Sequence, residues 1–175
     1  MALYIPVSAT GPNANDADVL DVALVNSTVI IRDFVLLAAD GNGSDAITVT
    51  ANASTFFIDG YLASDEGNAI NLNATSNHEI AIGPRGSLTA GSDAIFGTGT
   101  SNIITNNGTI VSAGNAVDIR NSGLTAHSTI TNNGAMTSAS TTINMNEGGQ
   151  VANTGSISAS GSGVFLGNYD GTNSY

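Results

Sequence analysis

The sequence predicts an all-β chain that winds into a parallel β-solenoid of about six coils, and three observations predict this fold. A short motif recurs every 21 to 26 residues, apolar and small polar residues alternate within each copy, and Gly-, Asn- and Ser-rich turns separate the alternating segments. Alternation with a period of two is the pattern of a strand with one buried face. A repeat of this length, holding two or three short strands, fits one coil of a solenoid.

The repeat is anchored by a glycine that is followed two residues later by an aliphatic residue. Five copies are complete, and an earlier copy has Phe34 before Leu36 and lacks the glycine. The best-matched copies read ITNNGTIVSAGNAVDI (104–119), ITNNGAMTSASTTINM (130–145) and VANTGSISASGSGVFL (151–166). Stacked coils would align the aliphatic residues in an inward-facing column: Leu36, Leu62, Leu88, Ile110, Met136 and Ile157.

A second anchor lies in the phrase GSDAI, which occurs at 43–47 and again at 91–95. Its aliphatic residue predicts a second inward column: Ile47, Ile70, Ile95, Val117, Ile143 and Val164. The polar residue before it predicts a turn column: Asp45, Asn68, Asp93, Asn115, Thr141 and Ser162. A further column of Asn106, Asn132 and Asn153 is expected to form a ladder of amide hydrogen bonds along the solenoid.

The two ends of the chain differ from the repeat. Residues 1–27 are expected to form an N-terminal cap, in which 15–25 is either a short helix or part of an irregular first coil. Residues 28–175 are expected to form the β-helix. No amphipathic cap follows Leu166, so we expect the solenoid either to continue beyond the C-terminal end or to stack there on another chain.

Composition excludes several classes of function. The formal net charge is −11, and Arg32, Arg85 and Arg120 are the only Lys or Arg residues, so binding to nucleic acid or to anionic lipid is not expected. The chain has no cysteine, which excludes disulfides and thiolate metal sites. It also has no long apolar run and no recognisable cleavable signal peptide, so insertion into a membrane is not expected.

One polar turn is a candidate calcium site. The segment DGNGSDAIT (40–48) resembles the calcium-binding nonapeptide of repeat-in-toxin proteins, with Asp40 in place of the first glycine. The resemblance implies a calcium ion held by Asp40, Asn42 and Asp45. Those proteins use tandem copies of the motif, and the second copy is absent here, so a long polar turn without metal is the alternative.

Other polar residues are expected to be structural. Asp65 and Glu66 are expected to be solvated turn charges, and His78 and His127 to be single surface histidines. Asp59 and Arg85 occupy the same repeat position and could form an ion pair between coils. Because the arginines do not share a column with clustered carboxylates, no catalytic site is expected and the chain is not predicted to be an enzyme.

The phrases ITNNGTI (104–110) and GNAV (114–117) resemble the passenger regions of bacterial β-helical surface proteins, including autotransporter adhesins and large type I-secreted proteins. The likeness covers roughly residues 28–170. It implies a right-handed parallel β-helix, exposure outside the cell, and structural or adhesive work. No catalytic residue is implied.

These expectations lead to three hypotheses for function. The first is a structural or adhesive module of a bacterial surface or secreted protein, located outside the cell, whose loops at 40–46, 97–102 and 120–128 meet a glycan or a host-surface ligand. The second is a secreted module that requires calcium to fold. The third is a fragment of a polysaccharide-active β-helix enzyme. Self-association end to end, through the open C-terminal coil, is an expected mode of assembly.

Overall fold

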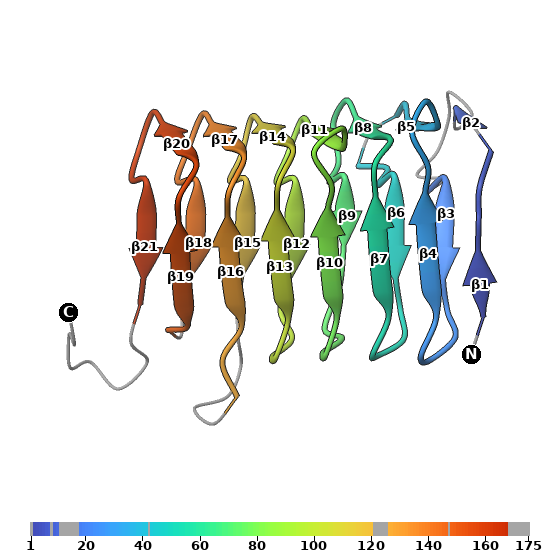
Figure 1. Ribbon diagram of the computed structural model, residues 1–175, viewed down its shortest axis with the longest axis horizontal. Coiled ribbons are helices and arrows are strands. Elements are labelled where there is room, and N and C mark those ends of the chain that lie inside the picture. Colours follow the sequence, from blue (N-terminus) through green and yellow to red (C-terminus); the bar gives the residue numbers. More distant parts are fainter. Residues whose placement is uncertain are drawn as a thin grey trace.

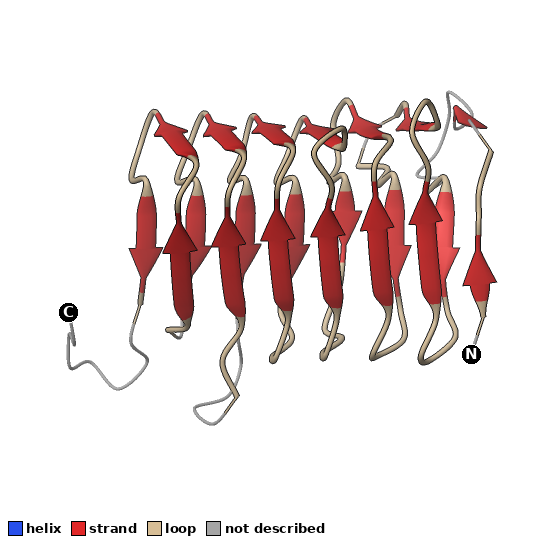
Figure 2. Ribbon diagram, viewed as in Figure 1, coloured by secondary structure: helices blue, strands red, loops and turns tan. Residues whose placement is uncertain are grey.

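The computed structural model describes residues 2–7, 9–10, 18–41, 43–120, 126–146 and 148–167. Every regular element in this part of the chain is a β-strand, and the strands form three seven-stranded sheets in which all neighbours are parallel (Figure 2). Among the described residues, no helix is long and apolar enough to cross a membrane. The predicted all-β parallel solenoid is therefore confirmed.

Each sheet takes one strand from every coil. The strands of the first sheet are β1 (Leu3–Tyr4), β4 (Thr28–Ile31), β7 (Thr55–Ile58), β10 (Glu79–Ile82), β13 (Ile103–Asn106), β16 (Thr129–Asn132) and β19 (Gln150–Asn153). Those of the second sheet are β2 (Ala9–Thr10), β5 (Leu36–Ala39), β8 (Tyr61–Ser64), β11 (Ser87–Ala90), β14 (Thr109–Ser112), β17 (Ala135–Ser138) and β20 (Ser156–Ala159). Those of the third sheet are β3 (Leu20–Val22), β6 (Ile47–Val49), β9 (Ile70–Asn71), β12 (Ile95–Gly97), β15 (Val117–Ile119), β18 (Ile143–Met145) and β21 (Val164–Leu166).

The coil is right-handed. In Figure 1 the chain rises at the front through the first sheet, crosses the top through the second and descends at the back through the third, while it advances from right to left. We call β4–β6 coil 1, and the following triplets are coils 2 to 6, ending with β19–β21. The short strands β1–β3 precede them as the N-terminal coil, so six regular coils follow an incomplete one, close to the predicted number.

The N-terminal segment is extended where the structure describes it. β1, β2 and β3 pair in parallel with β4, β5 and β6, so this segment forms a coil of the solenoid. Of the stretch 15–25 in which a short helix was one expectation, residues 18–25 contain a strand and no helix, and the rest lies outside the described residues. The irregular first coil, the other expectation, accounts for the described part.

The second inward column is confirmed throughout. Ile47, Ile70, Ile95, Val117, Ile143 and Val164 pair in one continuous register along the third sheet. The first five side chains are fully buried, whereas Val164 is 40% exposed because no described coil covers it. Leu20 extends this column into the N-terminal coil.

The first inward column is confirmed with one correction. Leu62, Leu88, Ile110, Met136 and Ile157 are in register along the second sheet. In coil 1, however, Leu37 pairs with Leu62 and is buried, while Leu36 pairs with Tyr61 and is 38% exposed. The prediction of Leu36 was wrong by one residue because coil 1 has Val35 where later coils have glycine, so the anchor that sets the register is missing.

A column of glycines explains how closely the coils stack between the first and second sheets. An added Cβ on Gly108 would lie 2.2 Å from the carbonyl oxygen of Gly86, and one on Gly134 would lie 2.1 Å from that of Gly108. Real Cβ atoms do not approach oxygen so closely, so only glycine fits where each coil packs on the turn before it.

The turns at this corner vary in length, and this variation overturns one predicted ion pair. Four residues join β4 to β5 and β10 to β11, whereas only Asp59 and Gly60 join β7 to β8 (Figure 1). The two long turns meet over the short one, because the Arg85 guanidinium lies 2.8 Å from the Asp33 carboxylate two coils away. Arg85 therefore pairs with Asp33 rather than with Asp59, whose carboxylate packs against Gly83.

Candidate functional site

Asp45, one of the three predicted calcium ligands, lies in the turn between β5 and β6 and is 5% exposed. One carboxylate oxygen accepts hydrogen bonds from the backbone N–H of Asn68 (2.7 Å) and from its side-chain amide (2.9 Å). The other oxygen accepts from the Asn71 amide (2.7 Å) and the Thr48 hydroxyl (3.2 Å). Burial raises the pKa of Asp45, although its hydrogen bonds to Asn68 and Asn71 oppose that shift. This carboxylate therefore joins coil 1 to coil 2.

Asp40, at the other end of the same turn, is paired with a different acid. Its carboxyl group is hydrogen-bonded to that of Asp65 in coil 2, and this bond, together with the repulsion between the two groups, raises the pKa of Asp40. The backbone N–H of Gly41 donates to Asp65 (3.2 Å) and lowers the pKa of Asp65. Both acids are exposed. The structure thus brings Asp40 to Asp65, whereas Asp45 is bonded to asparagines and a threonine.

The predicted calcium site is only partly described, because Asn42 lies outside the described residues. In the part of the chain that the structure does describe, no three or more His, Cys, Asp or Glu side chains are grouped to hold a metal ion. A calcium site formed by Asp40, Asn42 and Asp45 stays a prediction.

The polar turn column predicted from the GSDAI phrase is a hydrogen-bonded ladder. The side chain of Asp93 accepts from the backbone N–H of Asn115 (2.6 Å), and the side chain of Asn115 accepts from that of Thr141 (3.1 Å). Asp45 and Asn68 form the same link, and Asp18 adds one at the N-terminal coil by accepting from the Asp45 N–H (2.9 Å). The side chains of these four residues, Asp18, Asp45, Asp93 and Asn115, each accept a hydrogen bond from the backbone of the following coil.

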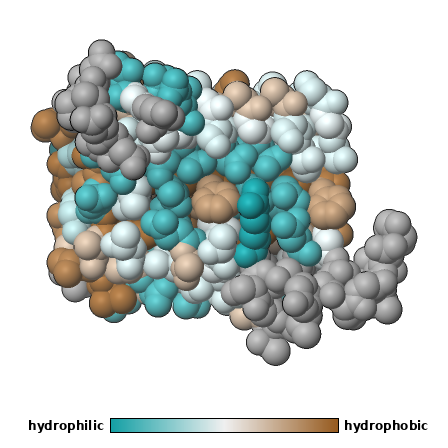
Figure 3. All heavy atoms as spheres, turned by 180° about the vertical axis from the view of Figure 1, so that it is seen from behind, coloured by the Kyte–Doolittle hydropathy of each residue, from teal (hydrophilic) through white to brown (hydrophobic). Residues whose placement is uncertain are grey.

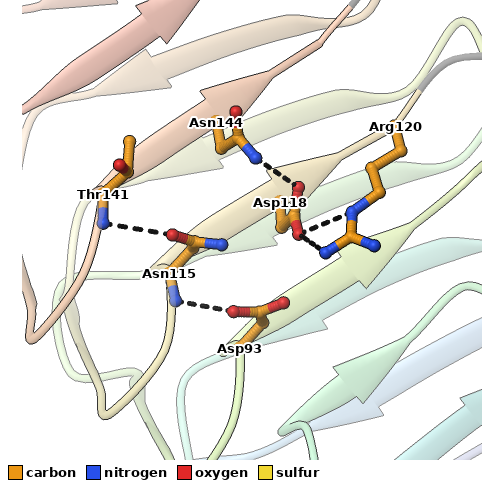
Figure 4. A network of polar contacts seen from close by, with 6 residues as sticks. All are labelled: Asp93, Asn115, Asp118, Arg120, Thr141 and Asn144. Atoms are coloured by element: carbon orange, nitrogen blue, oxygen red, sulfur yellow. Dashed lines mark hydrogen bonds and ion pairs between the residues drawn. The ribbon is translucent and has the colours of Figure 1, made fainter. Parts of the chain in front are cut away.

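An ion pair between a buried aspartate and a half-exposed arginine on the third sheet was not expected from the sequence. Asp118, on β15, is fully buried, and one of its carboxylate oxygens accepts from two nitrogens of Arg120 at 3.0 and 2.8 Å (Figure 4). The other oxygen accepts from the amide of Asn144 in the next coil (2.9 Å). The guanidinium also lies over the ring of Phe96, 5.2 Å from its centre, which adds a cation–π contact.

Asp93 lies beside this pair, at the turn below Asp118 (Figure 4). Its pKa is raised chiefly by burial and further by the neighbouring Asp118, while the N–H of Asn115 opposes the shift. Figure 3 shows the face that carries the third sheet, where hydrophilic side chains surround isolated hydrophobic ones. Hydrogen bonds satisfy the carboxylate of Asp118 and partly satisfy that of Asp93, so the arrangement links coils 3, 4 and 5.

The structure corrects the expectation that His78 lies at the surface. His78 is 1% exposed and belongs to a column of buried polar residues just before the first-sheet strands: Ser27, Ser54, His78, Asn102 and Ser128. The residues before the first four, Asn26, Ala53, Asn77 and Ser101, have φ between 57° and 63°, and this left-handed turn directs the next side chain inward. His127 is exposed, as predicted.

Side chains of the buried column accept hydrogen bonds from the backbone of the preceding coil, whereas those of the turn column accept from the following coil. His78 Nδ1 accepts from the N–H of Ser54 (3.2 Å), and the Asn102 side chain accepts from the N–H of His78 (3.1 Å). Because Nδ1 is an acceptor, the imidazole proton is on Nε2, which lies 2.8 Å from the Thr75 hydroxyl. Burial lowers the pKa of His78 to about 4, so the folded protein holds this ring neutral.

We therefore expect acid to destabilise the fold through His78. The unfolded chain binds this proton near pH 6.5, and the folded chain only near a pKa of about 4, so stability falls as the pH drops from 6.5 towards 4. The loss attributable to His78 has a ceiling of roughly 3 kcal/mol. Urea unfolding at a series of pH values measures it.

The substitution His78→Asn isolates this contribution, because Asn102 already fills the equivalent position and can accept the same backbone bond. Wild type should lose more stability between pH 6.5 and 4 than His78→Asn does. The matched control is His127→Asn, which changes the exposed histidine. Its free energy of unfolding should depend on pH in the same way as that of wild type. If the pH dependence were equal in wild type and His78→Asn, the His78 ring would not be buried in its neutral form.

The predicted asparagine ladder is confirmed between the first and second sheets. The amide of Asn106 donates to Asn132 (2.8 Å), and that of Asn132 donates to Asn153 (2.8 Å). The ladder begins at Asn106, whose own oxygen accepts from the N–H of Gly108 (3.1 Å). In coils 1 to 3 the same position holds Ile31, Ile58 and Ile82, so the corner is apolar there.

Comparison with known proteins does not assign the chain to a family. No protein-family model matches it, and neither the curated proteins nor the solved structures include a significant match. Function therefore has to be argued from the fold and the surface alone.

Proposed function

We propose that the chain is a structural or adhesive module of a bacterial surface or secreted protein, and that it works outside the cell as a stiff support. The observation that carries the proposal is how the buried acids are used. Asp45 and Asp118 are bonded to side chains or backbone of neighbouring coils. Buried carboxylates thus hold neighbouring coils together, which is what a scaffold requires.

The outward surface suits repetitive contacts with an extended ligand such as a glycan. Outward-facing positions on neighbouring coils are in register, for example Thr105 with Thr131 and Val111 with Thr137. Paired strands of a sheet lie about 4.8 Å apart, so these side chains form evenly spaced rows. The turn at 97–102 and the described part of the turn at 120–128 lead into β13 and β16, the first-sheet strands that carry Thr105 and Thr131.

The proposal is tested by coupling the purified chain to beads and measuring attachment to immobilised glycans and to host cells. We expect attachment above that of beads carrying a heat-unfolded sample, with no release of sugar from the polysaccharides offered. Release of sugar products would support the fragment of a polysaccharide-active enzyme instead. Absence of attachment to every surface would contradict adhesion and leave a purely structural module.

Calcium dependence is a second candidate, favoured by one observation. The exposed carboxyl groups of Asp40 and Asp65 share a hydrogen bond, and a cation bound between them would remove the repulsion that raises the pKa of Asp40. Repeating the attachment assay and a thermal melt in calcium and in chelator tests it. A rise in Tm with calcium that is lost in Asp40→Asn would support this candidate.

We also propose that the solenoid stacks end to end on a further coil at its C-terminal edge. In β21 the outward-facing residue Phe165 and the column residues Val164 and Leu166 are 40% to 48% exposed, whereas Ile143 and Met145 one coil earlier are fully buried. A parallel edge with exposed apolar side chains favours pairing with another strand.

A further inference from the structure

An apolar surface lies at the corner between the first and second sheets, over coils 1 and 2. We call it the corner patch and define it by four exposed residues, Phe34, Leu36, Phe57 and Tyr61, and by the partly exposed Ile30. Ile30 pairs with Phe57 on the first sheet, and Leu36 pairs with Tyr61 on the second. Phe34 is 84% exposed, Phe57 48% and Tyr61 44%. Contiguous exposed apolar residues of this size mark interaction surfaces in proteins.

The fold does not require these large side chains. In coil 3, Ala81 takes the position of Phe57 and Ser87 that of Tyr61, and both residues belong to strands in the same register. Later coils have threonine or another small residue at these two positions, such as Thr105 and Thr109. Phe57 and Tyr61 of coil 2 therefore point outward without serving the core, and a partner molecule at this corner would bury them.

The charges around the corner patch distinguish it from the rest of the surface. Arg32 and Arg85, two of the three arginines, lie at this corner together with Asp33 and Asp59. The formal charges of these four residues cancel, and Arg85 bridges to Asp33 at 2.8 Å. The whole chain carries −11, so most other faces of two copies would repel each other. The corner patch is thus an apolar surface, and the formal charges of the four ionic residues around it sum to zero.

We propose that the corner patch is an interface between two copies of this chain, which associate side by side. A two-fold contact would place the aromatic centre of one copy on that of the other. A cationic polypeptide would instead be repelled by Arg32 and Arg85, and it would be drawn to the acidic turns that hold Asp40, Asp65 and Glu66.

This contact uses the side of the solenoid, so it is distinct from stacking through β19–β21 and does not depend on the adhesive role. It also has a characteristic dependence on salt. Because two chains of the same sign approach each other, salt screens the repulsion and should strengthen the dimer. Binding of a cationic partner would weaken with salt.

Sedimentation velocity of the purified chain, over a wide range of concentration and at low and high salt, tests the proposal. We expect a reversible monomer–dimer equilibrium that shifts towards dimer as salt increases. The double variant Phe57→Ala, Tyr61→Ser gives coil 2 the residues of coil 3 and should weaken dimerisation by at least about tenfold.

The matched control changes two exposed apolar residues in coil 4. Ile103→Thr and Val111→Thr give it the residues of coil 5, Thr129 and Thr137, and should leave dimerisation unchanged. Circular dichroism and Tm confirm that both double variants are folded. A wild type that stays monomeric would overturn the proposal, as would equal weakening by both variants or association that salt weakens. Association lost only in Leu166→Glu would assign it to end-to-end stacking.

Discussion

The substitution Leu88→Asp should unfold the solenoid. Leu88 is fully buried between Leu62 and Ile110 in the inward column of the second sheet. A carboxylate there would lose its hydration without gaining a partner, at a cost of several kcal/mol. Because the total stability of a domain is only about 5–15 kcal/mol, most of the folded population should be lost near room temperature. Far-ultraviolet circular dichroism and urea unfolding measure the loss.

The adjacent residue provides the control for this experiment. Thr89 is exposed on the outer face of the same strand, β11. Thr89→Asp introduces the same charge one residue away and should change stability by no more than about 1 kcal/mol. If the two variants unfolded at the same urea concentration, Leu88 would not face the interior and the alternation of inward and outward residues would be wrong.

The substitution Gly108→Ala should have the second largest effect. The new methyl group would lie 2.2 Å from the carbonyl oxygen of Gly86 and 2.5 Å from that of Gly83. These are backbone atoms of the preceding coil, so relief requires the coils to separate locally and to weaken their hydrogen bonds. We expect a loss of at least about 2 kcal/mol in the free energy of unfolding, measured by urea titration.

Gly163→Ala is the matched control for the glycine column. The nearest neighbour of its added Cβ is a side-chain carbon of Ile157 at 3.5 Å, an ordinary contact distance. Alanine reduces the freedom of the unfolded chain, so this variant should be neutral or slightly more stable than wild type. A Gly108→Ala protein as stable as Gly163→Ala would show that the coils stack less closely than described here.

The repeat was predictable from the sequence because two kinds of residue fix its register. Glycine is required where a turn packs on the preceding backbone, and an aliphatic residue is required two positions later. The prediction failed by one residue at Leu36, where Val35 replaces the glycine and two leucines are adjacent. The alternation of apolar and polar residues does not indicate whether Leu36 or Leu37 faces inward, because each is followed two residues later by an alanine.

The polar interior was harder to predict, because sequence alone does not show that a polar side chain is buried. His78 was expected outside, yet the left-handed turn at Asn77 directs it inward. The sequence did contain one indication of this buried column, since a small or polar residue precedes each of the strands β4, β7, β10, β13 and β16. No comparable pattern indicated that Asp118 is buried, because its burial depends on Arg120 and Phe96 covering it from outside.

The change from isoleucine to asparagine at one corner divides the solenoid into two kinds of module. Copying coil 5 and inserting the copy behind itself would add one more amide between Asn132 and Asn153, and the chain of donors and acceptors would continue unbroken. The same copy placed between Ile58 and Ile82 would leave a buried amide against aliphatic neighbours. Lengthening of this protein by duplication is therefore expected to be tolerated in its C-terminal half and resisted in its N-terminal half.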